Sequence, residues 1–151
     1  MSDSLALETT RVIGAPIARV WDAWHDPRKM AKWWGPSDFH STVNELDVRA
    51  GGRFDVVMHG PDGTDYPNIY LFDRVVPPTQ LVYTNIGSKQ FGLAAFQSIV
   101  DLEALGDRTR VTLRSFFSSA EDKRKHVEDF HAIEGARQLL QRLEEQAVAT
   151  D

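Results

Sequence analysis

The tryptophan residues carry the strongest chemical signal in this sequence, because all four of them lie between Trp21 and Trp34. Trp21 and Trp24 are spaced to share one face of a short helix, and aromatic faces of this kind usually pack into a core. Trp33 and Trp34 are adjacent, so we expect that they cannot both face inward and that one of them borders the mouth of a cavity. An indole there could stack on a ligand and orient it through its N–H group.

His126 is the residue best placed to carry a proton, because it lies one helical turn before Phe130, near an apolar stripe. A histidine in a reactive pocket could act as a general acid or base. The simpler interpretation is an exposed histidine, or one whose hydrogen bonds are satisfied within the protein. Glu128 and His131 have the Glu-x-x-His spacing of a di-iron bundle, which needs a second copy of that motif. The sequence has one copy and no cysteine, so we expect neither a metal site nor a cofactor.

Asp73 and Arg74 are ionisable residues that could reach the interior of a sheet. The segment 68–76 is apolar on both alternating faces, so its pattern does not decide which face is buried. If the odd-numbered residues face inward then Asp73 does, and if the even-numbered residues do then Arg74 does. Either charge could fix the polar end of a ligand. The remaining alternative is a salt bridge on the solvent side.

The elements that must position these residues can be read from the periodicity of the chain. We expect a first strand over 6–13 and two short helices between Pro16 and Trp34. A period of two then predicts six antiparallel strands, over 43–49, 53–59, 68–76, 81–84, 91–104 and 108–117. A long amphipathic helix follows, capped by Ser118 or Ser119. Its apolar stripe consists of Val127, Phe130, Ile133, Ala136, Leu140, Leu143 and Ala147.

The composition limits the classes of partner. Seventeen Lys and Arg residues stand against 22 Asp and Glu residues, which gives a formal net charge of −5 and no basic stripe for a nucleic acid. No apolar run is long enough to span a membrane, and the segment 1–14 does not look like a secretory signal. We expect one domain over residues 1–151, with no nucleic-acid or membrane partner, in the cytoplasm.

Short segments of the chain follow one another in the order of a known fold. They are 15–16, 20–21, WWGP at 33–36, DVRAGG at 47–52, DGTDYPN at 62–68, 76–78, 81–84, 109–112, 134–135, Leu140 and Leu143. This ordered set resembles the START-like (SRPBCC, helix-grip) superfamily, and within it the domain related to the activator of the heat-shock chaperone ATPase. The resemblance implies an α+β fold, in which a curved antiparallel sheet of about seven strands wraps around a long C-terminal helix. Ala50 stands where the family often has proline.

The resemblance also implies a class of function, because members of the superfamily mostly bind apolar or amphipathic small molecules and some relatives are enzymes. Our leading hypothesis is a cavity between the sheet and the C-terminal helix that binds a small hydrophobic or aromatic-containing molecule. The alternatives are a module that interacts with a heat-shock chaperone, and a cofactor-free cyclase or hydrolase that uses the same pocket. The expected ligand-binding residues are Trp33, Trp34, Phe54, Met58, Phe96, His126 and Phe130.

Overall fold

Seven strands and four helices make up residues 5–149, the part of the chain that the computed structural model describes. The first residues of the segment 1–14, in which we expect no secretory signal, lie outside this part. The first half of the chain contains β1 (Ala6–Ile13), α1 (Ile17–Asp22), α2 (Pro27–Trp33), β2 (His40–Leu46), β3 (Arg53–His59) and β4 (Asp65–Val76). The second half contains β5 (Gln80–Asn85), β6 (Phe96–Leu105), β7 (Arg108–Phe116), α3 (Ala120–Glu128) and α4 (Ala132–Val148).

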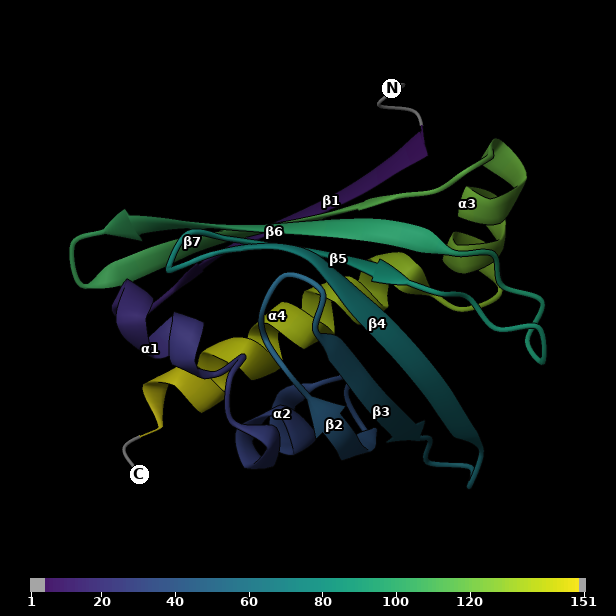
Figure 1. The fold of residues 1–151 in the computed structure, drawn as a ribbon, viewed down its shortest axis with the longest axis horizontal. Helices are drawn as coiled ribbons and strands as arrows, with labels where there is room; N and C mark the ends of the chain where they lie inside the picture. Colours follow the sequence, from purple (N-terminus) through teal and green to yellow (C-terminus); the bar gives the residue numbers. More distant parts are fainter. Residues whose placement is uncertain (1–4, 150–151) are drawn as a thin grey trace.

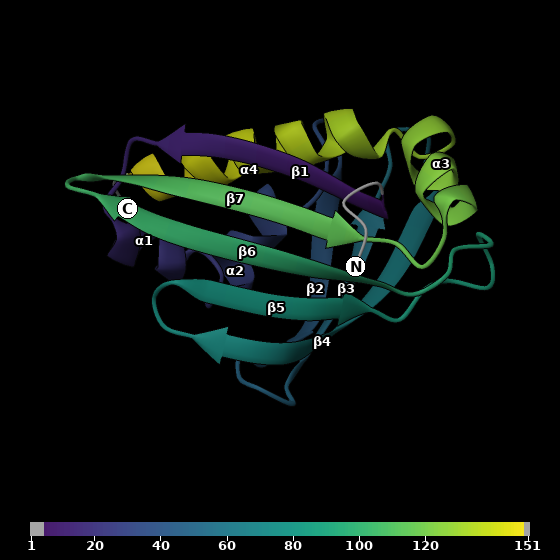
Figure 2. The ribbon, with the colours of Figure 1, turned by 90° about the horizontal axis from the view of Figure 1, so that it is seen from above.

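The sheet has the strand order β1-β7-β6-β5-β4-β3-β2, and every neighbouring pair is antiparallel. Figure 1 shows the sheet curving over α4: β1, β7, β6 and β5 run above the helix, and β4, β3 and β2 turn down beside it. Figure 2 looks onto the sheet from above and places α1 and α3 at opposite ends. This arrangement confirms the predicted α+β helix-grip fold, with two short helices after the first strand.

A bulge in β4 decides the orientation of the two charged residues in that strand. The pairing of β4 with β5 shifts between Phe72 and Arg74. Tyr70 and Phe72 are buried before the shift, whereas Val75 packs on the core after it. The extra residue of a bulge changes which alternation faces inward. Asp73 and Arg74 are therefore both exposed, so of the alternatives left open by the sequence neither inward orientation occurs, and both residues lie on the solvent side.

The outward-facing Asp73 is held by two neighbouring strands. Its carboxylate accepts hydrogen bonds from Thr84 Oγ1 at 2.6 Å and from Gln97 Nε2 at 3.2 Å. These partners are polar and uncharged, so the contact differs from the salt bridge that we considered for the solvent side. The inner face of the sheet at this position carries no charge from either residue.

All four tryptophans are buried, with exposed fractions of 8% or less. Trp33 and Trp34 are both inside, so the expectation that only one of them faces inward is wrong. The reason is that α2 ends at Trp33, and Trp34 adopts an extended backbone with φ −71° and ψ 129°. The Trp34 side chain therefore does not point where the next side chain of a helix would point. Its ring contacts Phe54 on β3 and Tyr70 on β4.

The single long helix that we predicted is two helices. The Ser119 side chain accepts a hydrogen bond from the Asp122 N–H at 3.1 Å and so caps α3 as expected. His131, between α3 and α4, has a left-handed backbone with φ 54°, which a continuous right-handed helix cannot accommodate. Leu140, Leu143 and Ala147 are buried under the sheet, in the second half of α4. None of the helices in the described part of the chain is long and apolar enough to cross a membrane.

Candidate functional site

A cavity of about 840 Å³ lies between the inner face of the sheet, the loop 35–39, α3 and the first half of α4. Aromatic and aliphatic side chains make most of its wall: Trp34, Met58, Phe91, Phe96, Phe117 and Phe130. These residues come from five separate parts of the chain, and the curvature of the sheet brings them together. The result is a largely apolar concave site of the size that small-molecule pockets in proteins have.

Five of the seven residues that we expected at the site line this cavity, namely Trp34, Met58, Phe96, His126 and Phe130. The structure places Trp33 and Phe54 in the packed core beside the cavity instead. The Trp33 indole donates a hydrogen bond to the Ala23 carbonyl at 2.9 Å and turns its ring toward Trp24. Phe54 lies behind the Trp34 ring, with the two ring centres 5.1 Å apart. Trp34 therefore separates Phe54 from the cavity.

A polar row on the inner face of the sheet was missed by the sequence analysis. Ser98 and Ser115 lie opposite each other on β6 and β7, and their hydroxyl oxygens are 2.9 Å apart. The Asn85 side chain donates to Asn68 Oδ1 at 3.0 Å and accepts from the Gly87 N–H at 2.8 Å. A signal in the sequence could have indicated this row, because Ser98 interrupts the alternating apolar residues Phe96, Val100 and Leu102 of β6.

Two tyrosines complete the floor of the cavity in their neutral form. Burial raises the pKa of Tyr70 to about 12, and hydrogen bonding with the Asn85 and Trp34 side chains offsets a part of that rise. Burial also raises the pKa of Tyr83, and the neighbouring Tyr70 adds to the effect. Both phenols therefore keep their protons at neutral pH and bring no negative charge to the cavity floor.

His126 is buried against the cavity, with an exposed fraction of 7%. Its Nδ1 atom lies 2.9 Å from the Asp122 carbonyl oxygen, one turn earlier in α3. Its ring contacts Phe96, with ring centres 4.8 Å apart, and Phe117, at 4.5 Å. Within residues 5–149, its Nε2 atom has no hydrogen-bond partner. We expected an exposed histidine or one with all its hydrogen bonds made. His126 is instead buried, and only one of its two ring nitrogens has a hydrogen-bond partner.

The charges around the cavity are negative and lie at its rim. Glu8, Asp38, Asp129 and Glu134 border it, and all four are exposed. Neither lysine nor arginine occurs among the described residues of the lining. Exposed carboxylates remain hydrated, so their field inside the cavity is weakened by solvent.

The loop 35–39 forms a fixed wall, because side chains of α4 hold its backbone. Arg142 Nη1 donates to the Gly35 and Pro36 carbonyl oxygens at 3.0 Å and 2.9 Å, and Nη2 donates to the Lys32 carbonyl oxygen. Gln138 accepts a hydrogen bond from the Ser37 N–H at 3.0 Å. Gln138 and Arg142 lie about one helical turn apart, so these bonds attach the loop to α4 at two successive turns.

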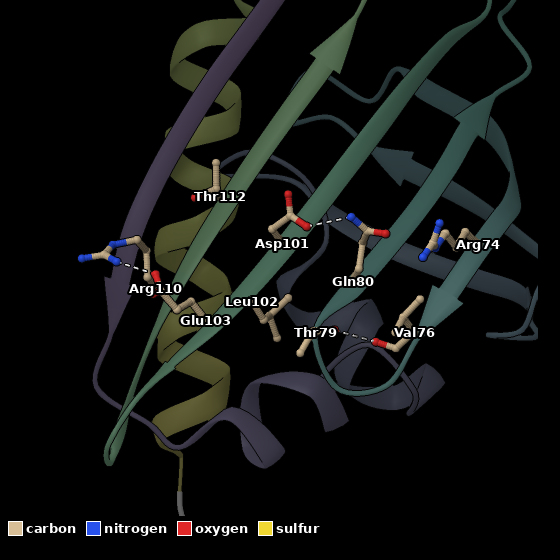
Figure 3. Close-up of a pocket in the computed structure, with 9 residues that line it drawn as sticks. All are labelled: Arg74, Val76, Thr79, Gln80, Asp101, Leu102, Glu103, Arg110 and Thr112. Carbon is tan, nitrogen blue, oxygen red and sulfur yellow. Dashed lines mark hydrogen bonds and ion pairs between the residues drawn. The ribbon is translucent and has the colours of Figure 1, made fainter.

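A second, smaller cavity of about 310 Å³ lies on the outer face of the sheet (Figure 3). Four of its polar side chains form two pairs with one another. Arg110 pairs with Glu103 at 2.5 Å, and the Gln80 amide donates to Asp101 at 2.9 Å. Figure 3 shows Arg74 apart from these pairs. Such a surface offers little apolar area to a ligand, so the larger inner cavity is the better candidate site.

The Glu-x-x-His spacing falls across the break between the two helices. Glu128 ends α3 and lies 3.6 Å from Arg124 Nη1, and His131 precedes α4. Among residues 5–149 there is no group of three or more His, Cys, Asp or Glu side chains that could hold a metal ion.

A family model matches residues 14–147 of the chain, and its description is "Activator of Hsp90 ATPase homolog 1-like protein". Among curated proteins, none matches the chain.

Several solved structures have the same fold over nearly the whole chain. A protein from Mycobacterium smegmatis is 30% identical with a TM-score of 0.85, and the match covers 99% of this chain and 94% of that one. A protein from Arthrobacter aurescens is 28% identical with a TM-score of 0.88, over 96% of this chain and 87% of that one. An AHSA1 protein from Silicibacter pomeroyi is 22% identical with a TM-score of 0.74, over 93% and 96%, which is a likeness of fold alone.

Proposed function

Because the chain belongs to the family of Activator of Hsp90 ATPase homolog 1-like proteins, with their START-like fold, we propose that it binds a small apolar or aromatic-containing molecule. The binding site is the cavity between the sheet and helices α3 and α4. The observation that carries this proposal is the size and lining of that cavity, about 840 Å³ with mainly aromatic walls. Ligand pockets in proteins occupy about 300–1,000 Å³ and have similar linings.

The walls of the cavity are suited to flat apolar molecules. Trp34, Phe96 and Phe130 offer ring faces and edges, and Met58 has a flexible thioether that adapts to the shape of its neighbour. Each square ångström of apolar surface that a ligand buries contributes about 25 cal/mol. No metal ion or cofactor is needed for this kind of binding, because transfer of apolar surface from water supplies the free energy.

Tryptophan fluorescence tests the proposal directly. Trp34 lines the cavity, so titration with a naphthalene derivative should give a saturable change of emission in the parent protein. Trp34→Phe keeps an aromatic wall and should lose most of that change. Trp21→Phe is the matched control, because Trp21 is also buried but contacts His25 outside the cavity.

Two outcomes would contradict the proposal. One is an emission that stays unchanged up to the solubility limit of the ligand, together with no heat of binding in calorimetry. The other is a change that persists in Trp34→Phe and disappears in Trp21→Phe, because the ligand would then sit elsewhere. Native mass spectrometry of freshly purified protein is an independent test, in which a retained apolar adduct supports the proposal.

Interaction with a heat-shock chaperone is a second candidate function, and the family description supports it. The measurement is the ATPase rate of an Hsp90-type chaperone with and without the purified chain. Stimulation that saturates with the chain, and that survives occupation of the cavity, would favour this function over ligand binding alone.

A cofactor-free cyclase or hydrolase is a third candidate, which the free Nε2 atom of His126 supports, because an imidazole nitrogen can accept a proton from a bound substrate. Turnover that is lost in His126→Phe, while apolar ligands still bind, would favour it.

A further inference from the structure

We propose that the ligand of the inner cavity is a neutral aromatic molecule with a hydroxyl group, such as a phenol, and that His126 Nε2 accepts a hydrogen bond from this hydroxyl. The inference rests on the proposed function, because it concerns the same cavity. It assigns the ligand a polar group of one kind and places that group beside α3.

The hydrogen bond that His126 Nδ1 makes determines whether Nε2 donates or accepts a hydrogen bond. A carbonyl oxygen only accepts hydrogen bonds, so the Nδ1 atom that faces the Asp122 carbonyl at 2.9 Å must carry the hydrogen. In a neutral imidazole with the hydrogen on Nδ1, Nε2 presents a lone pair. A group that binds there must therefore donate, as the O–H of an alcohol or a phenol does.

The amide and serine side chains of the cavity floor already have partners. Asn85 is bonded to Asn68 and to the backbone of Gly87, and Ser98 is bonded to Ser115. Within residues 5–149, two buried side-chain nitrogens or oxygens have no partner: Trp24 Nε1 and His126 Nε2. Trp24 lies in the packed core and does not line the cavity. Of these two atoms, His126 Nε2 is thus the one that belongs to a residue of the cavity lining.

The surroundings of the His126 ring make an unused acceptor costly. Phe96, Phe117 and Phe130 contact the ring, with centres 4.8, 4.5 and 6.4 Å away, and their side chains have no polar atoms. A buried polar atom without a hydrogen bond loses its hydration and gains nothing in return. A ligand hydroxyl needs one acceptor here, whereas an ordered water usually needs two to four polar partners.

The charges at the site select against ionised ligands. A carboxylate or phosphate group would meet the Nε2 lone pair of the neutral imidazole, and the described lining contains neither lysine nor arginine to pair with it. An ammonium group would have to lose its hydration inside, because Asp129 and Glu134 remain exposed at the rim. A neutral hydroxyl can use the acceptor and loses much less hydration than either ion.

Matched ligands on one ring system test the inference. 2-Naphthol has the donor, 2-methoxynaphthalene has the same body without it, and 2-naphthoate and 2-naphthylmethylamine have the two charges. In the parent protein we expect 2-naphthol to bind about 3- to 10-fold more tightly than 2-methoxynaphthalene, which is the contribution of one hydrogen bond. We expect 2-naphthoate and the amine to bind more weakly than 2-naphthol.

The variant His126→Phe should reduce the preference for naphthol over methoxynaphthalene to about one, because it removes the acceptor and keeps a ring of similar size. His25→Phe is the matched control, since His25 Nδ1 also lies 2.9 Å from the carbonyl oxygen one turn earlier, that of Trp21. His25 does not line the cavity, so its variant should keep the preference of the parent.

A measurement on the parent protein covers the case in which His126→Phe does not fold. The nitrogen-15 resonance of His126 Nε2 should move upfield when 2-naphthol binds, because its lone pair accepts a hydrogen bond, and should stay in place with 2-methoxynaphthalene. Equal affinities for these two ligands, or tightest binding of 2-naphthoate or of the amine, would overturn the inference and leave the proposed function standing. If none of the four ligands binds, the proposed function itself fails.

Discussion

The two ends of the space beneath the sheet differ in how they are filled. At the end near α1 (Figure 1), the second half of α4 buries Leu140, Leu143 and Ala147, all at 4% exposure or less. At the end near α3, Phe130 is only half-buried and Ile133 is 48% exposed. Both ends face the same sheet and both are rich in apolar residues. The cavity therefore results from the change of chain direction between α3 and α4, and not from a shortage of apolar side chains.

The break at His131 explains the difference. A continuous helix would carry its apolar stripe along the whole length of the sheet, as we predicted. The left-handed residue redirects the chain between α3 and α4, so the residues on either side of it border a cavity instead of filling one. We expect substitutions at the packed end to reduce stability, and substitutions at the open end to change binding more than stability.

Trp33→Ala tests the packed end and should have the largest effect. The indole is 1% exposed and donates to the Ala23 carbonyl, so its removal leaves a large hole and a buried carbonyl without its partner. We expect a loss of about 3–5 kcal/mol in the free energy of unfolding, measured with denaturant. A loss below about 1 kcal/mol would mean that this end is packed no better than the other, because even small core truncations usually cost about 0.5–1.5 kcal/mol.

His131→Val tests the origin of the break. A β-branched residue with φ near 54° should destabilise the protein by about 1–2 kcal/mol. His131→Gly is the control, because glycine adopts this conformation without a steric penalty, and its stability should stay close to that of the parent. Equal stability of the two variants would show that the left-handed conformation at His131 is not what separates the helices.

Phe130→Ala tests the open end. The ring is half-buried, so we expect a loss of about 1 kcal/mol in stability, well below the roughly 3–5 kcal/mol of a fully packed ring. The same variant should weaken the binding of naphthalene derivatives, because the ring is part of the cavity wall. Thermal unfolding and fluorescence titration of one preparation compare the two effects. A stability loss as large as that of Trp33→Ala would remove the contrast between the ends.

Gly135→Ala should have the smallest effect and the opposite sign. Gly135 lies in the first part of α4, and an added methyl group would meet Pro36 Cγ at 3.8 Å, an ordinary contact distance. Alanine in a helix is favoured over glycine by about 0.5–1 kcal/mol, so the melting temperature should rise slightly. A fall in melting temperature would mean that the loop 35–39 and α4 are packed more tightly than this distance indicates.

The fold was largely predictable because its signals are local. Alternation of polar and apolar residues predicted the strands. The start of α2 also has a local signal, because Pro27 follows Asp26, whose Oδ1 accepts a hydrogen bond from the Arg28 N–H at 2.9 Å. The boundaries were less accurate: the strand expected over 91–104 begins at Phe96. The resemblance to the START-like superfamily then supplied the curvature that local patterns do not contain.

The candidate site was predicted less well, because it depends on backbone turns that leave little trace in the sequence. His131 is not a glycine, and although histidine adopts the left-handed conformation more often than most residues do, its type alone does not predict a break in the helix. The apolar stripe continues across it. The bulge at Asp73 was hidden because both faces of that segment are apolar. The sequence left open which of Trp33 and Trp34 lies beside the cavity, because the extended backbone that separates the two side chains follows only from the structure.

The Arg142 side chain, which fastens the loop 35–39 to α4, has a consequence for the effect of salt on binding. Its guanidinium donates to the carbonyl oxygens of Lys32, Gly35 and Pro36. Arg142 therefore binds the backbone of the cavity wall and does not act as a counter-ion for a ligand. Between about 0.01 M and 0.15 M ionic strength the Debye length falls from about 30 Å to about 8 Å. A neutral ligand has no net charge to be screened, so its dissociation constant should be the same at both concentrations, whereas that of a charged ligand should change.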